Sequence, residues 1–287
     1  MDTIEMSRAE APLRRRLRLP LQAPWAGWIG AVVVAVWVLA TLLGPFLSPH
    51  DSGAVVGSMF APISAAHPLG TDYLGRDMLS RILDGARYTL GVSLLAAVLA
   101  SMMGTALGVL AAIRGGVLDM IMSRLTDALI AIPHLLFALV VVAALGTSLP
   151  VLIGLLAVSY TPGAFRIARS LALGINAMDF VQVARARGER TPYILFREIL
   201  PNMLLPMLTD FGLRFVFAVL LLSGLSFLGL GIQPPHADWG SLVRENIEAI
   251  YEAAPAVLAP ALAIASLTIG VNLLIDNLPR RRPGGEA

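Results

Sequence analysis

The sequence has 287 residues, of which 57% are hydrophobic and only 14% are charged, and its formal net charge is +2. A water-soluble domain carries about a quarter of its residues as charged side chains, so a chain this apolar is expected to face hydrocarbon. The absence of cysteine excludes disulfides, thiolate metal sites and cysteine nucleophiles. All 21 basic residues are arginines scattered between apolar runs, which favours a membrane orientation signal over nucleic-acid binding.

Apolar runs predict an all-α protein of six membrane-spanning helices, since about 20 apolar residues cross a bilayer. The uncharged stretch from Ala128 to Phe165 is too long for one span and contains the turn-forming Gly146 to Pro150 near its middle, which indicates a hairpin of two spans. The predicted spans cover residues 28–48, 88–112, 126–145, 150–168, 211–232 and 254–276.

Arginine placement predicts that both termini are cytoplasmic. With this orientation, 16 of the 21 arginines fall in segments on the cytoplasmic side and four fall outside, while Arg214 lies at the edge of a span. The chain then divides into an N-terminal tail (1–27), a transmembrane domain (28–278) with a cytoplasmic loop at 169–208, and a C-terminal tail (279–287). This organisation places the protein in the inner membrane as a multi-pass chain in contact with lipid.

Small residues are expected where membrane helices pack, because lipid gives helices no hydrophobic reason to associate. Gly104 and Gly108 in the second span and Gly224, Gly229 and Gly231 in the fifth fit such packed faces. An alternative is that these glycines allow helices to slide during gating.

The cytoplasmic loop contains the pattern of two short helices joined by a tight turn. Phe180, Val183 and Ala184 recur at helical spacing, and Gly188 is a suitable left-handed C-terminal cap. Thr191 followed by Pro192 is a good start for a second helix, which should end before Pro201. Two such helices make a knob too small for a core of its own, so it must pack on something. The alternative is a solvated basic loop held against anionic lipid.

The stretch from Val181 to Pro201 resembles the coupling loop of bacterial ABC-importer permeases. That pattern reads Glu-Ala-Ala, three residues, Gly, nine residues, Ile, one residue, Leu-Pro. Gln182 and Val183 replace the glutamate and first alanine, and Glu198 stands at the isoleucine position. The resemblance implies an ATPase-coupling site formed by Gln182, Val183, Ala184, Arg185, Ala186, Arg187, Gly188, Glu189, Leu200 and Pro201.

Two further segments are similar to the second permease subunit of dipeptide, oligopeptide and nickel importers. They are His67 to Arg87, and Ser226 to Gly231 followed by Pro234-Pro235 and Asp238-Trp239-Gly240. The resemblance implies a type I ABC-importer bundle that pairs with a homologous permease, two cytoplasmic ATPases and an external solute-binding protein. It implies short peptides as cargo, with nickel or metal chelates, opines and glutathione-like compounds as alternatives.

Chemistry inside this chain is not expected. With no lysine the sequence cannot contain a phosphate-binding Gly-x-x-x-x-Gly-Lys-Ser/Thr loop, so ATP and Mg²⁺ are expected on partner chains. The histidines lie far apart without metal-ligand spacing, and no catalytic or metal site is predicted; they are His50, His67, His134 and His236. One alternative function is a self-sufficient secondary transporter, which requires inverted repeats and broken helices. Another is an intramembrane enzyme, which requires an acid, a base or a metal set.

Charged residues near the spans give two further expectations. Residues 69–83 could form an amphipathic helix at the outer interface with Arg76, Asp77 and Arg81 toward water; with Trp239 as an interfacial anchor, these are candidate contacts for a binding protein. The alternative is a lid that seals the bundle. Asp210 and Arg214 are four residues apart and can pair on one helical face, either structurally or as a gate at the pore mouth.

Overall fold

The computed structural model describes residues 24–252 and 255–277. Within these residues all elements are helices, apart from two isolated β-bridges, so the all-α prediction is confirmed for this part of the chain. The first helix already begins at Pro24, earlier than predicted. The tail predicted at 279–287 lies outside the described residues, as does the predicted N-terminal tail up to residue 23.

Among the described residues, five helical runs are long and apolar enough to cross a membrane, and α3 with α4 would make a sixth span if counted together. In chain order the elements are α1 (Pro24–Leu47), α2 (Met78–Arg114), α3 (Gly116–Ala131), α4 (His134–Leu145), α5 (Leu149–Asn176), α6 (Asp179–Ala186), α7 (Thr191–Tyr193), a π-helical turn (Ile194–Ile199), α8 (Leu200–Phe227), α9 (Trp239–Glu245), a 3-10 turn (Ile247–Ile250) and α10 (Leu258–Asp276).

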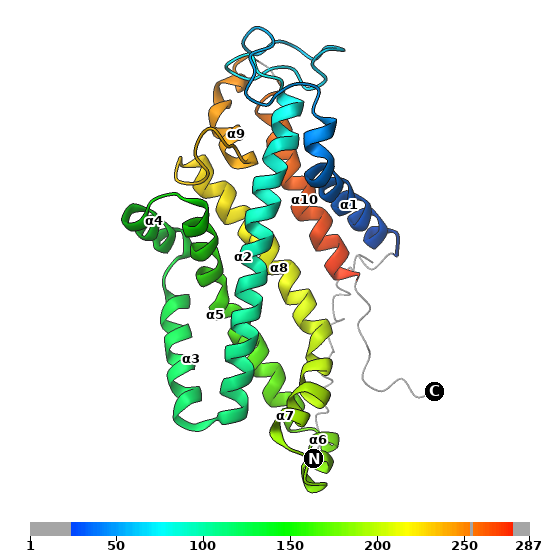
Figure 1. The fold of residues 1–287 in the computed structure, drawn as a ribbon, viewed down its shortest axis with the longest axis vertical. Coiled ribbons are helices and arrows are strands. Elements are labelled where there is room, and N and C mark those ends of the chain that lie inside the picture. Colours follow the sequence, from blue (N-terminus) through cyan, green and yellow to red (C-terminus); the bar gives the residue numbers. More distant parts are fainter. Residues whose placement is uncertain (1–23, 253–254, 278–287) are drawn as a thin grey trace, which may run out of the picture.

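The long helices run side by side along the molecule (Figure 1). α2 packs against α5 and α8 in the centre, and α1 and α10 lie together on one flank. The 48–77 loop, which joins α1 to α2, covers one end of the bundle, and α6 and α7 lie at the opposite end. The two ends of the bundle are therefore built from different parts of the chain.

Glycines let the central helices approach closely. A methyl group at Gly108 of α2 would lie 2.6 Å from the carbonyl oxygen of Phe165 in α5, and one at Gly104 would lie 2.8 Å from the Phe165 nitrogen. A methyl group at Gly30 of α1 would lie 2.6 Å from the carbonyl oxygen of Gly270 in α10. These distances are too short for a side chain, so the packing role predicted for Gly104 and Gly108 is confirmed.

The same prediction fails for the glycines of the fifth span. Within the described residues, a methyl group at Gly224 would meet open space. Gly229 and Gly231 lie beyond the end of α8, where Gly229 has a φ of +83° that suits glycine in a turn. Of the five glycines predicted for packed faces, Gly104 and Gly108 of α2 are therefore the two that lie at a close contact between helices in the described residues.

The predicted third span is broken into two helices. α3 and α4 meet at a bend of 90° around Ile132 and Pro133. Proline lacks a backbone N–H and disfavours helical geometry in the residue before it, and Ile132 is extended with a φ of −85° and a ψ of 123°. The segment predicted as the third span, 126–145, is therefore not one continuous helix, because this proline ends α3.

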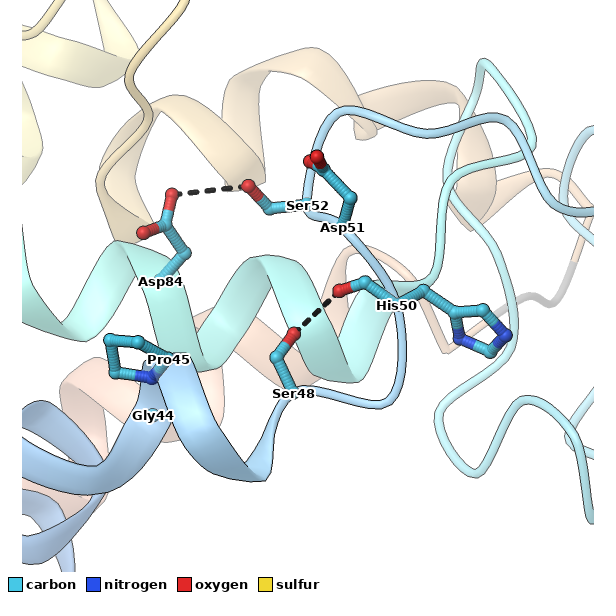
Figure 2. A pocket seen from close by; sticks show the side chains of 7 residues that line it. All are labelled: Gly44, Pro45, Ser48, His50, Asp51, Ser52 and Asp84. Carbon is cyan, nitrogen blue, oxygen red and sulfur yellow. Dashed lines mark hydrogen bonds between the residues drawn. The ribbon is translucent and has the colours of Figure 1, made fainter.

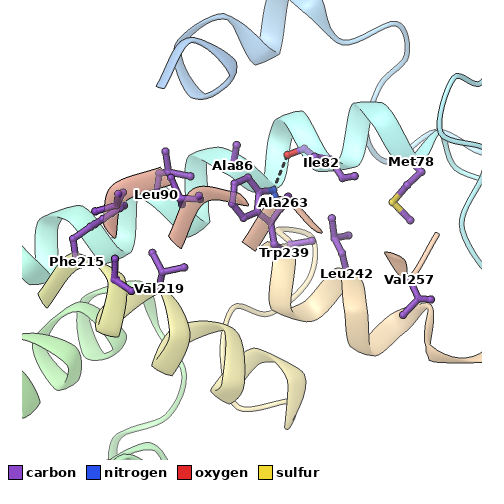
Figure 3. Close-up of a cluster of buried hydrophobic side chains, with 14 of the residues drawn as sticks. Met78, Ile82, Ala86, Leu90, Phe215, Val219, Trp239, Leu242, Val257 and Ala263 are labelled. Carbon is purple, nitrogen blue, oxygen red and sulfur yellow. Dashed lines mark hydrogen bonds between the residues drawn. The ribbon is translucent and has the colours of Figure 1, made fainter. Parts of the chain in front are cut away.

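The largest buried cluster begins under the 48–77 loop and continues along α2, α8 and α10 (Figure 3). Met78 and Ile82 of α2, Phe215 and Val219 of α8 and Trp239 of α9 pack together there. Elsewhere, large apolar side chains face outward, and Trp28 of α1 is 74% exposed. Such a surface suits hydrocarbon and agrees with a membrane-embedded bundle.

Candidate functional site

The segment that joins α5 to α8 protrudes at one end of the bundle (Figure 1). Its helix α6 keeps Val181 and Ala184 fully buried in a cluster that includes Ile199. The other side is open in this chain, since Phe180 is 40% exposed and Val183 is 57% exposed. The apolar side chains of α6 therefore lie on two sides: one set holds α6 to the bundle, and the other is available to another protein.

Gly188 ends α6 as the sequence predicts. Its φ is +85°, in the left-handed region that favours glycine, and its N–H donates to the carbonyl of Arg185 at 2.9 Å. The N–H of Glu189 donates to the carbonyl of Ala184 at 3.2 Å. These two bonds form a Schellman cap, so the reversal of the chain at this point has a fixed geometry.

Polar side chains of α6 attach it to the end of α5. Gln182 Nε2 donates to the carbonyl oxygen of Asn176 at 2.8 Å, and Arg185 Nη2 donates to Asn176 Oδ1 at 2.6 Å. Of the ten coupling residues implied by the resemblance, Ala184 is buried and Glu189 and Leu200 are partly buried. The exposed ones are Gln182, Val183, Arg185, Ala186, Arg187, Gly188 and Pro201.

The second half of the knob differs from the prediction. The helix that starts at Thr191, with Arg190 in the cap position, does not end before Pro201 but passes through a π-helical turn at Ile194–Ile199 into α8. Pro201 falls in the first turn of α8, where proline is tolerated because its missing N–H is not needed there. The coupling segment and the fifth span therefore form one helical run, Thr191–Phe227.

The predicted pair of Asp210 and Arg214 is confirmed as a pair. Arg214 Nε donates to Asp210 Oδ2 at 2.6 Å and Arg214 Nη2 donates to Asp210 Oδ1 at 2.7 Å, with both residues buried. Arg214 Nη1 also donates to the carbonyl oxygen of Tyr160 in α5 at 3.0 Å. A methyl group at Gly163 would lie 2.6 Å from Arg214 Nη1, so this glycine makes room for the guanidinium.

A cavity of about 510 Å³ lies beside this pair. Arg214 reaches its wall, and the rings of His134 and Tyr160 approach each other there with centroids 5.3 Å apart. Its other lining residues are Ile130, Ser159, Gly163, Arg166, Ile167 and Phe217. The cavity opens to the surface of this chain, where His134, Arg166 and Phe217 are exposed. A cavity lined by two arginines and aromatic rings is suited to a polar solute of small size.

The expectation that Arg76 and Arg81 point toward water is wrong. Both pair with Asp72, a fully buried carboxylate, through Arg76 Nε at 2.6 Å and Arg81 Nη1 at 2.7 Å. Both also reach Glu245 Oε2 in α9, at 3.2 Å and 2.7 Å respectively. Sequence reasoning missed Asp72 and Glu245, which neutralise the arginines and tie the 48–77 loop and its continuation to α9.

Asp77 is likewise buried, because it caps α2. Its Oδ2 accepts the backbone N–H of Ser80 at 2.9 Å, and its exposure is 0%. The predicted interfacial helix over residues 69–83 does not form separately; from Met78 onward it is the first part of α2, with Met78 and Ile82 in the core. The second span therefore begins ten residues before the predicted residue 88.

Trp239 is a core residue and not an interfacial anchor. It is fully buried, its indole Nε1 donates to the carbonyl oxygen of Ile82 at 3.0 Å (Figure 3), and its ring meets that of Trp37 at a centroid distance of 4.6 Å. Its backbone N–H donates to Thr89 Oγ1 at 3.0 Å. The four candidate contacts for a binding protein therefore form the interior of this end of the bundle.

The protruding helix α6 with its fixed turn at Gly188 agrees with the coupling loop that the sequence resembles. The family itself follows from a sequence match over a longer part of the chain. A family model described as the binding-protein-dependent transport system inner membrane component matches residues 104–282, which contain the whole segment from α5 to α8. The chain belongs to this family. It is thus a multi-pass inner-membrane permease, as the resemblance implied.

Relatives of this permease are transport proteins with closely matched lengths. It is 38% identical over 251 residues to a putative peptide transport system permease of Brucella suis, covering 87% of this chain and 84% of the relative. It is 33% identical to a probable D,D-dipeptide transport system permease of Escherichia coli, covering 86% and 84%. It is 36% identical to a glutathione transport system permease of Pectobacterium atrosepticum, covering 75% and 71%.

Proposed function

We propose that this permease forms one half of the pore of an ATP-driven importer for short peptides, which an external solute-binding protein delivers. The peptide, D,D-dipeptide and glutathione permeases among its relatives support a peptide-like cargo. The observation that carries the proposal is the protruding α6, which ends at a rigid turn and leaves Phe180 and Val183 uncovered beside exposed arginines. A surface of that kind at the end of a bundle suits a separate protein partner.

The proposed complex contains a homologous permease, two ATPases and the binding protein. ATP and Mg²⁺ belong on the ATPases, because the permease has no lysine for a phosphate-binding loop. The permease itself contributes no catalytic residue in this proposal. Its part is to bind the ATPase at α6 and to change the shape of the pore.

The pathway from α6 to the pore is short and continuous. α6 packs on the π-helical turn Ile194–Ile199, which leads directly into α8 and so to Arg214 at the cavity wall. When the ATPases close on ATP, they bind one arrangement of the two permeases better than the other, and this differential binding shifts the pore between inward- and outward-facing states. The cavity beside Arg214 is then exposed to each side in turn.

The orientation in this proposal places α6 and both termini in the cytoplasm. Because the chain has no cysteine, a single introduced cysteine can be labelled without any background from the permease. Val183→Cys at the α6 end and Leu74→Cys in the 48–77 loop replace side chains that are 57% and 48% exposed. In spheroplasts that express the permease without its ATPases, a membrane-impermeant maleimide should label Leu74→Cys at once and Val183→Cys only after permeabilisation. The opposite pattern would invert the proposed orientation.

Docking of the ATPase is tested by charge substitution at α6. Val183→Glu and Gly188→Arg should insert normally but lower the amount of ATPase that co-purifies with the permease by at least tenfold. The matched control is Val117→Glu in the first turn of α3, where the valine is 67% exposed and lies outside the coupling segment. Unchanged recovery of ATPase with both α6 variants would contradict the docking role.

Cargo and energy source are tested in proteoliposomes that contain the whole complex. Uptake of a labelled dipeptide should require ATP on the side of the bilayer that carries the ATPases and the binding protein on the opposite side. Uptake of a nickel chelate or an opine without dipeptide uptake would replace the proposed substrate. Transport by the permease without any ATPase would support the secondary-transporter alternative instead.

A further inference from the structure

Three possible metal ligands come together where the 48–77 loop meets α2. The ligand atoms of His50, His67 and Asp77 all lie within 4.8 Å of one another. His67 Nδ1 is 3.2 Å from Asp77 Oδ1, and His50 Nδ1 is 4.0 Å from Asp77 Oδ2. The three residues are too far apart in sequence to form a recognisable motif, and only the folded loop brings them together.

His50 carries a polar atom that the protein leaves unpaired. Its Nδ1 is buried, and within the described residues it has no hydrogen-bond partner. Figure 2 shows that its ring points away from Asp84, which bonds Ser52 across a pocket of about 140 Å³. An enclosed nitrogen without a partner is unusual in a folded protein and requires an explanation.

A hydrogen bond between His67 and Asp77 accounts for only part of this arrangement. It satisfies His67 Nδ1, but 4.0 Å is too long for a hydrogen bond from His50 to the same carboxylate. One cation between the three residues would satisfy both imidazoles. Ligand atoms around a tetrahedral zinc ion lie about 3.3 Å apart when each bond is about 2.0–2.1 Å. The separation of His67 Nδ1 and Asp77 Oδ1, 3.2 Å, matches this value. His50 Nδ1 is farther away, at 4.0 Å from Asp77 Oδ2, and rotation of its partly exposed side chain would bring it nearer.

We propose that His50, His67 and Asp77 bind a first-row divalent cation, with Zn²⁺ the best match. Two imidazoles and one carboxylate are a donor set that Zn²⁺ favours and that Mg²⁺, which prefers oxygen ligands and water, does not. The partial exposure of His50 leaves water access to a fourth position. This inference concerns the 48–77 loop and does not depend on the cargo or on the ATPase.

The surroundings hold the ligands in place before any ion arrives. Ser80 donates its backbone N–H and its hydroxyl to Asp77 Oδ2, at 2.9 Å and 2.7 Å, which leaves Oδ1 on the side of His67. The backbone N–H of His50 donates to Ser80 Oγ at 3.2 Å, and that of His67 donates to Ser64 Oγ at 3.0 Å. Ser80 thus orients both Asp77 and the backbone of His50, the role that outer partners play around metal ligands.

A bound ion would add a direct link between three points of the chain. His50 follows the end of α1, His67 lies within the loop, and Asp77 begins α2. The consequence is that metal fixes the fold of the 48–77 loop, and that its removal loosens this loop without disturbing the α6 end. Limited proteolysis can therefore report on the site independently of transport.

The test uses the full permease, purified in detergent without a polyhistidine tag. Equilibrium dialysis against Zn²⁺ should give one ion per chain for the unaltered protein, and Mg²⁺ should not compete. His50→Ala and His67→Ala should each weaken Zn²⁺ binding at least tenfold, and Ser80→Ala should weaken it about tenfold through misplacement of Asp77. Zn²⁺ should slow cleavage of the 48–77 loop in the unaltered protein but not in His50→Ala or His67→Ala.

His236→Ala is the matched control, since His236 is exposed, bonds Tyr88 and lies outside the cluster. Its Zn²⁺ affinity should equal that of the unaltered protein. The absorption spectrum of bound Co²⁺ gives a second measurement on each variant that folds, and it should show nitrogen and oxygen ligands. Zn²⁺ binding that survives the double substitution of His50 and His67, or absence of binding by the unaltered chain, would overturn the proposal.

Discussion

Arg214 holds Asp210 by two parallel hydrogen bonds one turn away in α8, and its remaining nitrogen bonds the carbonyl oxygen of Tyr160 in α5. The charges are buried at 8% and 5% exposure, so neither can rely on water. Their mutual neutralisation is what makes an arginine tolerable inside the bundle. The pair also connects two central helices beside the cavity.

The first prediction concerns this pair. Arg214→Ala or Asp210→Ala should each destabilise the permease by about 3–5 kcal/mol, because each leaves an unpaired buried charge. The double variant should be more stable than either single variant, since both charges are then absent. Thermal unfolding of the purified protein measures the three effects, and simple addition of the two single losses would show that the pair is not coupled.

The second prediction concerns Trp239. Trp239→Phe should lower the unfolding free energy by about 1 kcal/mol through loss of the hydrogen bond to Ile82, and Trp239→Ala by about 3–5 kcal/mol through the cavity it leaves. Trp28→Phe, at a position 74% exposed, serves as the control and should change nothing measurable in detergent. Equal effects at the two tryptophans would argue against a core role for Trp239.

Close contact between α2 and α5 gives a third prediction. Gly108→Ala should destabilise by about 1–3 kcal/mol, because its methyl group would lie 2.6 Å from the Phe165 carbonyl oxygen and would force the helices apart. Gly91→Ala in the same helix is the control, since a methyl group there meets open space in the described residues. Alanine at Gly91 should be neutral or stabilising by up to about 1 kcal/mol. Identical melting temperatures for the two variants would contradict this contact.

A fourth prediction follows from Asp238, which caps α9. Burial raises the pKa of its carboxyl above the ordinary value, against the opposing effect of hydrogen bonds from Ser226 and Ser241. The folded state then holds a proton that the unfolded state has released. Stability should therefore fall as pH rises from about 3.9, the ordinary pKa, to the raised value, and stay level above it.

Asp238→Asn tests this dependence while keeping a capping side chain. The melting temperature of the unaltered permease should decrease through that pH window, and that of the Asn variant should decrease less. Asp238→Ala should in addition lose about 1 kcal/mol at every pH, because the N–H groups of Gly240 and Ser241 lose their acceptor. Parallel pH curves for the unaltered and Asn proteins would rule out a protonated Asp238.

Local signals in the sequence predicted the features that depend on short stretches of chain. Long apolar runs identify helices because every backbone polar group in lipid must be satisfied within the segment. Gly188 was predictable because a left-handed cap strongly favours glycine, and the Asp210–Arg214 pair because residues four apart share a helical face. The break in the third span also has a local signal, Pro133, because proline disfavours helical geometry in the residue before it.

Features that depend on distant residues were not predictable in this way. The spacing of Arg76 and Arg81 is typical of a helix face exposed to water. Only the fold places Asp72 and Glu245 beside these arginines and neutralises their charge. The proximity of His50 and His67 has the same origin, because it is set by the path of the loop and not by spacing. Periodicity records which residues share a local face, but it does not record which faces meet.

The helical run from Thr191 to Phe227 spans 37 residues, or about 55 Å at 1.5 Å per residue. One end adjoins α6, and the other adjoins α9, where Gly240 lies against Ser223. Arg214 fastens this rod to α5 partway along its length. If the run tilts as one body about this contact, a shift of its α6 end in one direction moves its far end in the opposite direction. Motion at the two faces of the membrane would then be reciprocal, with Arg214 near the fulcrum.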